Sequence, residues 1–512
     1  MKSMTGTVGV IKAEQQGLLE KMREMVGFLS SAVEKGEAAH EVEEGLWRRV
    51  LALGRQAFGT YLDLVGDGDA GERVRLQDGR EVRRLAKLHR RAYQSVFGLF
   101  ELERVVYGSR EGQKIEYVPL DERLRLPQGK NSYLLQDWDQ GLAVEVPFEK
   151  VNATLERMLG FKQSVHTLER NQREMAQACS PFWQAQPSVP AEQEGAVLVC
   201  SADGKGVPMR GAGEADPGVE APASGGMRPG TKKMALIGAI YTVNRYVRTP
   251  EEVLEALFRD APSPAPPPTR PKPCFKQVRA SLQRDADDRT EPQTREIFSW
   301  LALQAAQRNP DGNKPLVVLL DGQESLLTAS LKYFPPELAE QITDILDLLH
   351  ALGYLWEAVH LFHPSGSHAA STLVKKLARR MLHGDILGVI RSLRWCGTHH
   401  KLKGKRHEAL ERICGYYSNN AHRMAYDVYL QHGFPIASGV IEGACRCVVK
   451  DRMERSGMRW VLAGANAMLN MRSIYLSDLW EPFMQYRIRA ESQRLYPGLA
   501  ANDPDCSALL AA

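Results

Sequence analysis

The sequence predicts an α/β fold for the middle of the chain, with a mainly helical region before it. Two short apolar runs, 196–200 and 315–320, are typical of buried central strands because polar and glycine-rich sequence bounds each of them. Each run leads into an Asp-Gly pair, at Asp203 and at Asp321. From 348 to 435 nearly all of the sequence has helical spacing, which predicts a helical insertion after the strands.

Composition limits the class of protein. The chain has 512 residues, of which 43% are hydrophobic and 25% charged, as expected for a soluble globular protein of several domains. The net charge of +4 is weakly basic, so a nucleic-acid partner needs local basic patches. Eight scattered cysteines without a Cys-x-x-Cys pair argue against structural zinc and a disulfide scaffold. Neither a signal peptide nor an apolar run of membrane-spanning length is found, so we expect a cytoplasmic protein.

The N-terminal part is predicted as two regions, 1–89 and 90–180. Apolar residues at steps of three and four predict a first helix through Leu18 to Leu29, and a second follows at about 42–64. Aromatic and β-branched residues over 90–107 predict strands, with 114–119 as partner and a turn at 108–112.

Two short predicted helices then meet at Gly160. Their lengths and the glycine between them are typical of a helix-turn-helix. The second is expected to begin near Gln163 and to carry Arg170 and Arg173 as DNA contacts. A plain helical hairpin is the alternative. A linker with three prolines is expected over 180–194.

The predicted core occupies 195–347, the helical insertion 348–435, the C-terminal core helices 436–490 and a tail 491–512. Within the core we expect a further buried strand at 234–243 and a helix at Pro250 capped by Thr249. A short strand is expected at 342–347. A glycine-rich stretch, 211–230, predicts a loop, and 262–273 is a proline-rich extended insert.

A third acid precedes a basic segment after the insertion. Glu442, Arg446 and Lys450 are four residues apart, so they share one face of a helix. A solvated row of ion pairs is the ordinary explanation, and a metal-binding glutamate beside phosphate-binding cations is the functional one. Trp460 either stacks on a base or packs in the core.

The order of the acids is informative. An acid on a first strand, an acid after a later strand and a glutamate on a helix behind a helical insertion is the layout of ribonuclease-H-like nucleotidyl transferases. The chain further resembles insertion-sequence transposases of the ISKra group, within the Asp-Asp-Glu class. The segments that carry the resemblance are 201–207, 318–322, 344–356 and 438–460. They imply a ribonuclease-H-like catalytic core preceded by a DNA-binding region.

The resemblance also implies an activity, namely Mg-dependent DNA strand cleavage and strand transfer at insertion-sequence ends. Asp203, Asp321 and Glu442 correspond to the catalytic, metal-binding triad for two Mg²⁺ ions, with Mn²⁺ as a substitute. Asp344 and Asp347 are rivals of Asp321 for the second position. Relatives place a lysine seven residues after the glutamate, whereas here Val449 holds that offset and Lys450 comes one residue later.

The expected partner is double-stranded DNA, both the terminal repeats of the element and the target, bound by a homodimer or a higher assembly in the nucleoid. The candidate DNA contacts are Lys205, Arg446, Lys450, Arg452, Arg455, Arg459, Trp460, Arg170 and Arg173. Two alternatives stay open. An actin-like ATPase also places Asp-Gly turns around Mg²⁺-nucleotide but predicts two similar halves. A DNA-binding protein descended from a transposase would carry an idle site.

Overall fold

The computed structural model describes residues 4–112, 114–187, 189–190, 193–210, 232–258, 270–282 and 292–497, with only the backbone for 4–15 and 456. The predicted loop 211–230, the insert up to residue 269, most of the tail and Cys506 lie outside these ranges. The fold is mixed α/β and mostly helical. It divides into two compact units, the first made of Met1–Ala185 and Glu481–Ala512 and the second of Gln186–Trp480. None of the described helices combines the length and apolarity that a membrane span requires.

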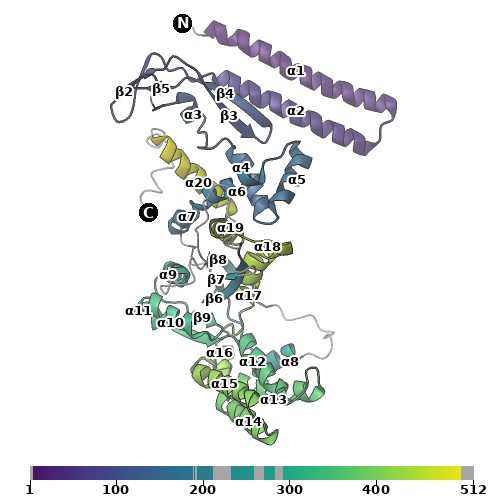
Figure 1. Cartoon of the computed structure of the whole chain (residues 1–512), viewed down its shortest axis with the longest axis vertical. Helices are drawn as coiled ribbons and strands as arrows, with labels where there is room; N and C mark the ends of the chain where they lie inside the picture. Colours follow the sequence, from purple (N-terminus) through teal and green to yellow (C-terminus); the bar gives the residue numbers. More distant parts are fainter. Residues whose placement is uncertain are drawn as a thin grey trace, which may run out of the picture. The chain divides into compact units, whose positions relative to one another are not determined.

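The first unit begins with two long helices, α1 (Met4–Lys35) and α2 (Ala39–Val65), which pack side by side (Figure 1). Both were expected from the spacing of their apolar residues. Three short strands then form one small sheet, in the order β1-β2-β5: β1 (Arg73–Arg75), β2 (Glu81–Arg84) and β5 (Tyr107–Gly108).

A separate β-hairpin corrects the prediction for 90–107. β3 (His89–Ser95) and β4 (Gly98–Arg104) pair antiparallel, so the chain reverses at Val96 and Phe97 within the aromatic run. Ser95 Oγ accepts a hydrogen bond from the Phe97 N–H at 3.0 Å, and Gly98 takes a φ of +116°. The turn stabilised by the Ser95 side chain, together with Gly98, therefore ends the strand despite the high β propensity of the residues around it. Tyr107 does pair with Tyr117 across the predicted 108–112 turn.

The helices of the first unit complete its core. They are α3 (Pro119–Arg123), α4 (Tyr133–Ala143), α5 (Phe148–Leu159), α6 (Val165–Ala176), α7 (Cys179–Ala185) and α20 (Trp480–Leu495). α5 ends at Gly160, which is left-handed with φ 77°, and Ser164 caps α6 through the Thr167 N–H, so both predicted helices form. α7 replaces the start of the predicted linker because Phe182 is buried against Phe483 of α20.

The second unit is built on a five-stranded mixed sheet, order β10-β9-β6-β7-β8. Its strands are β6 (Val197–Pro208), β7 (Lys232–Val243), β8 (Cys274–Leu282), β9 (Leu316–Leu320) and β10 (Ile342–Leu346). β6, β9 and β10 run parallel, and β7 and β8 are antiparallel to their neighbours. The first strand is longer than its apolar run 196–200, since β6 continues past Asp203 and Gly204 to Pro208 in pairing with β7.

Further helices cover this sheet and its edges: α8 (Pro250–Leu257), α9 (Pro292–Arg308), α10 (Glu324–Tyr333) and α11 (Pro336–Ala339). Thr249 and Glu252 form the expected capping box at the start of α8. α9 lies so close to β7 that a Cβ on Gly238 would stand 2.6 Å from Ile297 Cγ2. The glycine there allows the helix to approach the sheet.

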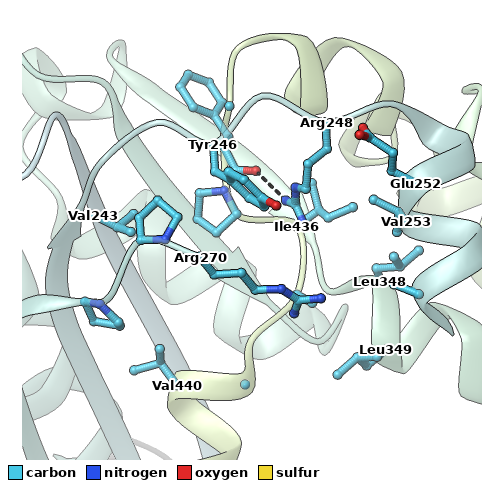
Figure 2. Close-up of a pocket in the computed structure, with 18 of the residues that line it drawn as sticks. Val243, Tyr246, Arg248, Glu252, Val253, Arg270, Leu348, Leu349, Ile436 and Val440 are labelled. Atoms are coloured by element: carbon cyan, nitrogen blue, oxygen red, sulfur yellow. Dashed lines mark hydrogen bonds between the residues drawn. The ribbon is translucent and has the colours of Figure 1, made fainter. Parts of the chain in front are cut away.

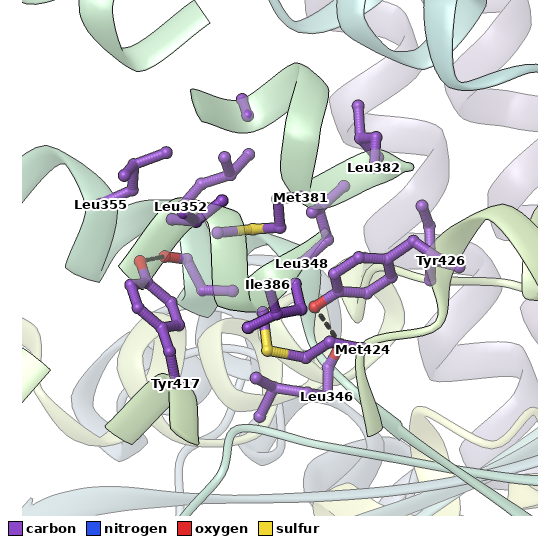
Figure 3. Close-up of a cluster of buried hydrophobic side chains, with 14 of the residues drawn as sticks. Leu346, Leu348, Leu352, Leu355, Met381, Leu382, Ile386, Tyr417, Met424 and Tyr426 are labelled. Carbon is purple, nitrogen blue, oxygen red and sulfur yellow. Dashed lines mark hydrogen bonds between the residues drawn. The ribbon is translucent and has the colours of Figure 1, made fainter. Parts of the chain in front are cut away.

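The predicted insertion is helical throughout its described length: α12 (Leu348–His360), α13 (His368–Leu382), α14 (Ile386–His399), α15 (Lys405–Asn420) and α16 (Tyr426–Gln431). Its apolar side chains join those of β6, β9 and β10 in one large core cluster (Figure 3). Two buried tyrosines also donate hydrogen bonds, Tyr417 to the Ala351 carbonyl at 2.8 Å and Tyr426 to the Leu346 carbonyl at 3.0 Å. The insertion is thereby fixed to the ends of the parallel strands.

The chain then returns to the sheet through α17 (Gly439–Cys445), a π-helical turn (Arg446–Lys450), α18 (Asp451–Met453) and α19 (Leu462–Tyr475). α17 packs on β6 and β7. Beyond α19, Ser477 accepts a hydrogen bond from the Val278 N–H of β8, and Ser473 of α19 accepts one from Ala280. These serines satisfy backbone donors on an edge strand that would otherwise need another partner.

Candidate metal centre

Three carboxylates form one row across the parallel strands. β6 and β9 pair up to Ser201 with Leu319, and β9 and β10 pair up to Leu320 with Leu346. Continuing the same register brings Asp203, within β6, level with Asp321 and Asp347, which directly follow the ends of β9 and β10. Neighbouring strands are about 4.8 Å apart, so the three side chains share one edge of the sheet.

The carboxylate of Asp203 lies close enough to that of Asp321 for the two to repel each other. Burial raises the pKa of its carboxyl, the Gln323 N–H that donates to Oδ1 at 3.0 Å lowers it, and the nearby Asp203 carboxylate raises it again. The pKa therefore lies above its ordinary value. Two carboxylates in this relation favour a cation between them.

Glu442 reaches the same region from α17. One turn after it, the buried Cys445 thiol donates to Asp203 Oδ2 at 3.4 Å. Burial raises the pKa of Cys445, and the charges of Asp203 and Glu442 raise it further. The Glu442 carboxylate also comes within 4.8 Å of ligand atoms of Asp347 and His350. α17 thus brings the third predicted acid beside the row.

His350 is a member of the site that sequence reasoning did not select. Its Nδ1 lies 3.2 Å from Asp347 Oδ2, and this hydrogen bond is the main cause that raises the pKa of the imidazole to about 9. The charges of Asp321 and Asp203 act in the same direction. His350 therefore carries a proton at neutral pH and places positive charge among the acids. The sequence signal that could have identified His350 is its position three residues after Asp347, at the start of a predicted helix.

The donor set suits a hard divalent cation. Mg²⁺ prefers carboxylate oxygens and keeps several waters, and the acids here compete for too little positive charge. Within the described residues, Asp347, His350 and Glu442 are the one group of three whose ligand atoms approach within 4.8 Å of one another. Asp203 and Asp321 adjoin this group through the strand register, so a bound ion would draw its ligands from the carboxylates of both sets, and His350 would ligate it only after losing its proton.

Asp344, a rival for the second position, has a different partner. Its Oδ2 forms a 2.8 Å ion pair with Arg423 Nε, whose side chain is almost completely buried. Asp347, in contrast, lies in the row beside Asp321. One oxygen of Asp347 already has a structural partner. Its Oδ1 accepts a hydrogen bond from the Leu349 N–H at 2.7 Å, as the N-cap of α12.

Comparison with known proteins adds little. No protein-family model matches the chain, and no curated protein matches it significantly. Among solved structures, it is similar to the Drosophila P element transposase strand transfer complex, at 11% sequence identity and a TM-score of 0.24, over 77% of this chain and 89% of that chain. A TM-score this low carries no argument about fold or function. The interpretation therefore depends on the site itself.

The candidate DNA contacts divide by exposure. Arg446, Lys450, Arg455, Arg459 and Arg170 are exposed, whereas Lys205 and Arg173 are half-buried. Lys205 is close enough to the site for its charge to lower the pKa of Cys445.

Two further candidate contacts are buried in this structure. Trp460 is buried and donates its indole N–H to the Met453 carbonyl at 3.0 Å. The Arg452 side chain is buried as well, with its guanidinium 5.2 Å from the Trp460 ring centre. Both are packing residues because the segment after α18 folds back on the end of β6, where Met209 pairs with Trp460.

Proposed function

We propose that the chain is a DNA transposase of the Asp-Asp-Glu class with a ribonuclease-H-like core. The observation that carries the proposal is the convergence of Asp203 and Asp321 in one row of the sheet, with Glu442 delivered beside them by α17. The helical insertion α12–α16 lies between the second strand acid and Glu442. This is the layout that the resemblance to the ISKra group implies.

The proposed chemistry is Mg-dependent cleavage and transfer of DNA strands at insertion-sequence ends. Asp203, Asp321 and Glu442 would hold two Mg²⁺ or Mn²⁺ ions, with Asp347 and His350 adjoining them. Such ions, when bound, lower the pKa of an attacking water and stabilise the leaving oxygen. Lys205 would contact a DNA phosphate from β6, beside Asp203, and no protein nucleophile is required.

The proposed partner is double-stranded DNA in the nucleoid, both the terminal repeats and the target. The exposed arginines and lysines after Glu442 would bind its backbone near the acids. Helices α5 and α6 would form a helix-turn-helix-like reader of the terminal repeat, with Arg170 as its exposed cation. Because two element ends are cut and joined, a homodimer or a higher assembly is proposed.

The alternatives meet different observations. An actin-like ATPase predicts one Asp-Gly strand in each of two similar halves, whereas β6 and β9 are adjacent in a single sheet. An idle, transposase-derived DNA-binding protein predicts DNA binding without cleavage, which only an activity measurement separates.

A cleavage assay tests the proposal. The purified chain is incubated with DNA carrying element ends and Mg²⁺, Mn²⁺ or EDTA, and nicked and joined products are counted. Asp203→Asn, Asp321→Asn and Glu442→Gln should each lower product by more than about 100-fold. Asp311→Asn, at an exposed acid outside the row, is the matched variant, and it should retain cleavage. Metal-dependent products from all three triad variants would refute the assignment.

A further inference from the structure

A second hollow lies beside the acids, with a volume of about 970 Å³. Its wall is made by the end of β7, the segment that leads to α8, the start of α12 and the stretch 433–440 that leads to α17. A volume near 1,000 Å³ is at the upper end for small-molecule sites. The hollow therefore has room for a nucleotide together with part of its backbone.

Two guanidinium groups enter this pocket from different segments, Arg248 and Arg270 (Figure 2). Burial lowers the pKa of Arg248, and the positive charge of Arg270 lowers it further. Arg248 Nη2 reaches the Phe434 carbonyl only at 3.5 Å, and its buried Nε has no hydrogen-bond partner among the described residues. A half-buried arginine with an unused donor, beside a second, exposed arginine, is suited to an anion.

Two acids also line the pocket, and the charge of Glu252 partly offsets the depressed pKa of Arg248. The Glu252 carboxylate accepts the Thr249 N–H at 2.7 Å and the Thr249 hydroxyl at 3.0 Å, as part of the α8 capping box. Glu255 is on the exposed side of α8. Much of the rest of the wall is apolar. The side chains that form it are Val243, Tyr246, Leu348, Ile436 and Val440.

The pocket adjoins the cleft that holds part of the candidate metal centre, with one residue between the two. Leu349 lines it and also lines the neighbouring cleft of about 450 Å³ that contains His350 and Glu442. Leu348 directly follows Asp347, and Val440 precedes Glu442 by two residues on α17. A strand with one phosphate at the acids therefore has its next nucleotide within reach of the pocket.

We propose that this pocket binds an unpaired nucleotide of the DNA strand adjacent to the phosphate that is cut or joined. Arg248 and Arg270 hold its phosphate, and the apolar wall takes the base. Extrusion of a base costs a few kcal/mol when it is paired, so an unpaired or mismatched nucleotide is preferred. The inference rests on the proposed function. A free nucleotide has the same chemistry, and the position of the pocket next to the cleft of His350 and Glu442 favours the strand.

Binding is measured without catalysis, in EDTA and in Ca²⁺, by fluorescence of 2-aminopurine placed at each position of an end duplex with a short overhang. One position should change its emission on binding. Arg270→Ala, at an exposed residue, and Arg248→Ala should each weaken the preference for the overhang duplex over a blunt one by about tenfold. Arg245→Ala is the matched control, because Arg245 is exposed three residues away and does not line the pocket.

The outcomes separate the two proposals. Unchanged overhang preference in Arg270→Ala and in a folded Arg248→Ala would overturn the pocket inference while leaving cleavage by the wild-type protein untouched. Deoxynucleoside monophosphates that bind as tightly as the oligonucleotide and compete with it would overturn the strand version in favour of a free nucleotide. Persistent cleavage by the triad variants would refute the proposed function without altering the 2-aminopurine signal.

Discussion

The folded structure disfavours the ionised form of the Asp321 carboxyl. Burial and the Asp203 carboxylate raise its pKa, against the Gln323 N–H and the charges of His350 and Arg423. When the folded pKa of an acid lies above its unfolded value, ionisation destabilises the fold, and stability falls as pH rises through that interval. Ionised Asp321 therefore costs the folded chain stability when no counter-charge is bound beside it.

Removing this charge should stabilise the protein when no metal is bound. Asp321→Asn keeps the oxygen that accepts from Gln323 and loses the repulsion with Asp203. We expect thermal unfolding in EDTA to shift upward by about 2–4 °C, the size of a 1 kcal/mol change in a domain of this length. Mg²⁺ should raise the melting temperature of the wild type but not of the variant. Asp311→Asn, at an exposed acid, is the control, and a lower melting temperature for Asp321→Asn in EDTA would contradict the expectation.

Asp139 on α4 titrates for a different reason. Its side chain is fully buried, and this desolvation raises the pKa to about 7, although Gln163 Nε2 donates to Oδ2 at 2.6 Å. Oδ1 has no hydrogen-bond partner among the described residues. The carboxyl is thus favoured in its protonated form below neutral pH.

The pH dependence of the first unit should follow from Asp139. Because the folded-state pKa is raised, Asp139 contributes to the free energy of unfolding. This contribution is fully present below the ordinary pKa near 3.8 and is lost as pH rises towards 7. Asp139→Asn removes this loss. In urea unfolding, the stability difference between variant and wild type should therefore grow by about 1.4 kcal/mol per pH unit between pH 4 and 7, and stop growing above pH 7. Parallel pH profiles for the two proteins would disprove this account.

At the scale of elements, a buried ion pair joins the start of β6 to the end of α9. Arg308 Nε lies 2.7 Å from Glu194 Oε1, and Nη2 lies 3.2 Å from Oε2. Both side chains are nearly inaccessible, at 1% and 0% exposure. Sequence reasoning placed Glu194 in a linker because its partner is more than a hundred residues away.

Breaking this pair should cost more than breaking an exposed one. Glu194→Gln leaves the Arg308 charge buried without its counter-charge, which typically costs about 3–5 kcal/mol. Glu411→Gln breaks the exposed pair with Arg394 and should cost less than about 1 kcal/mol. Urea unfolding of the second unit compares the two, and equal losses would show that burial of the pair adds nothing.

Elements whose signals are local were predictable. The Thr249–Glu252 capping box and the helix break at Gly160 each depend on residues within a few positions, and both formed as expected. α7 was missed because Phe182 finds its packing partner, Phe483, some three hundred residues later. The reversal at Val96 was missed because aromatic residues on both sides concealed a two-residue turn.

For the whole molecule, the site was predictable only in part. The pairing of Asp203 with Asp321 followed from two strands with the same ending, and Glu442 from the order of acids. Asp347, His350 and Cys445 join them only because β10 pairs with β9 and α17 packs on β6. Strand order and register are tertiary properties, so a linear sequence names candidates without showing which of them meet.

An exposed apolar stripe on α1 bears on assembly. Leu19, Met22, Val26, Leu29 and Val33 follow one another at steps of three and four, and all are exposed, Val26 by 60% and Val33 by 82%. That spacing is the heptad pattern of a coiled coil, whose seam pairs with a similar seam on a second helix. Because α2 covers a different face of α1, the stripe fits α1 of a second copy, in keeping with the proposed dimer.

Charge placed in this seam should prevent dimerisation. Val26→Glu buries a carboxylate between the helices, and we expect the dimer dissociation constant to rise at least tenfold, about 1.4 kcal/mol. Gly27→Glu adds the same charge one position away on the outer side of α1, where a Cβ meets no atom within 4 Å, and should leave the dimer intact. Sedimentation velocity over a concentration series, with and without end DNA, measures both. A wild-type chain that stays monomeric, or a Val26→Glu variant that dimerises like it, would show that strand transfer assembles through another surface.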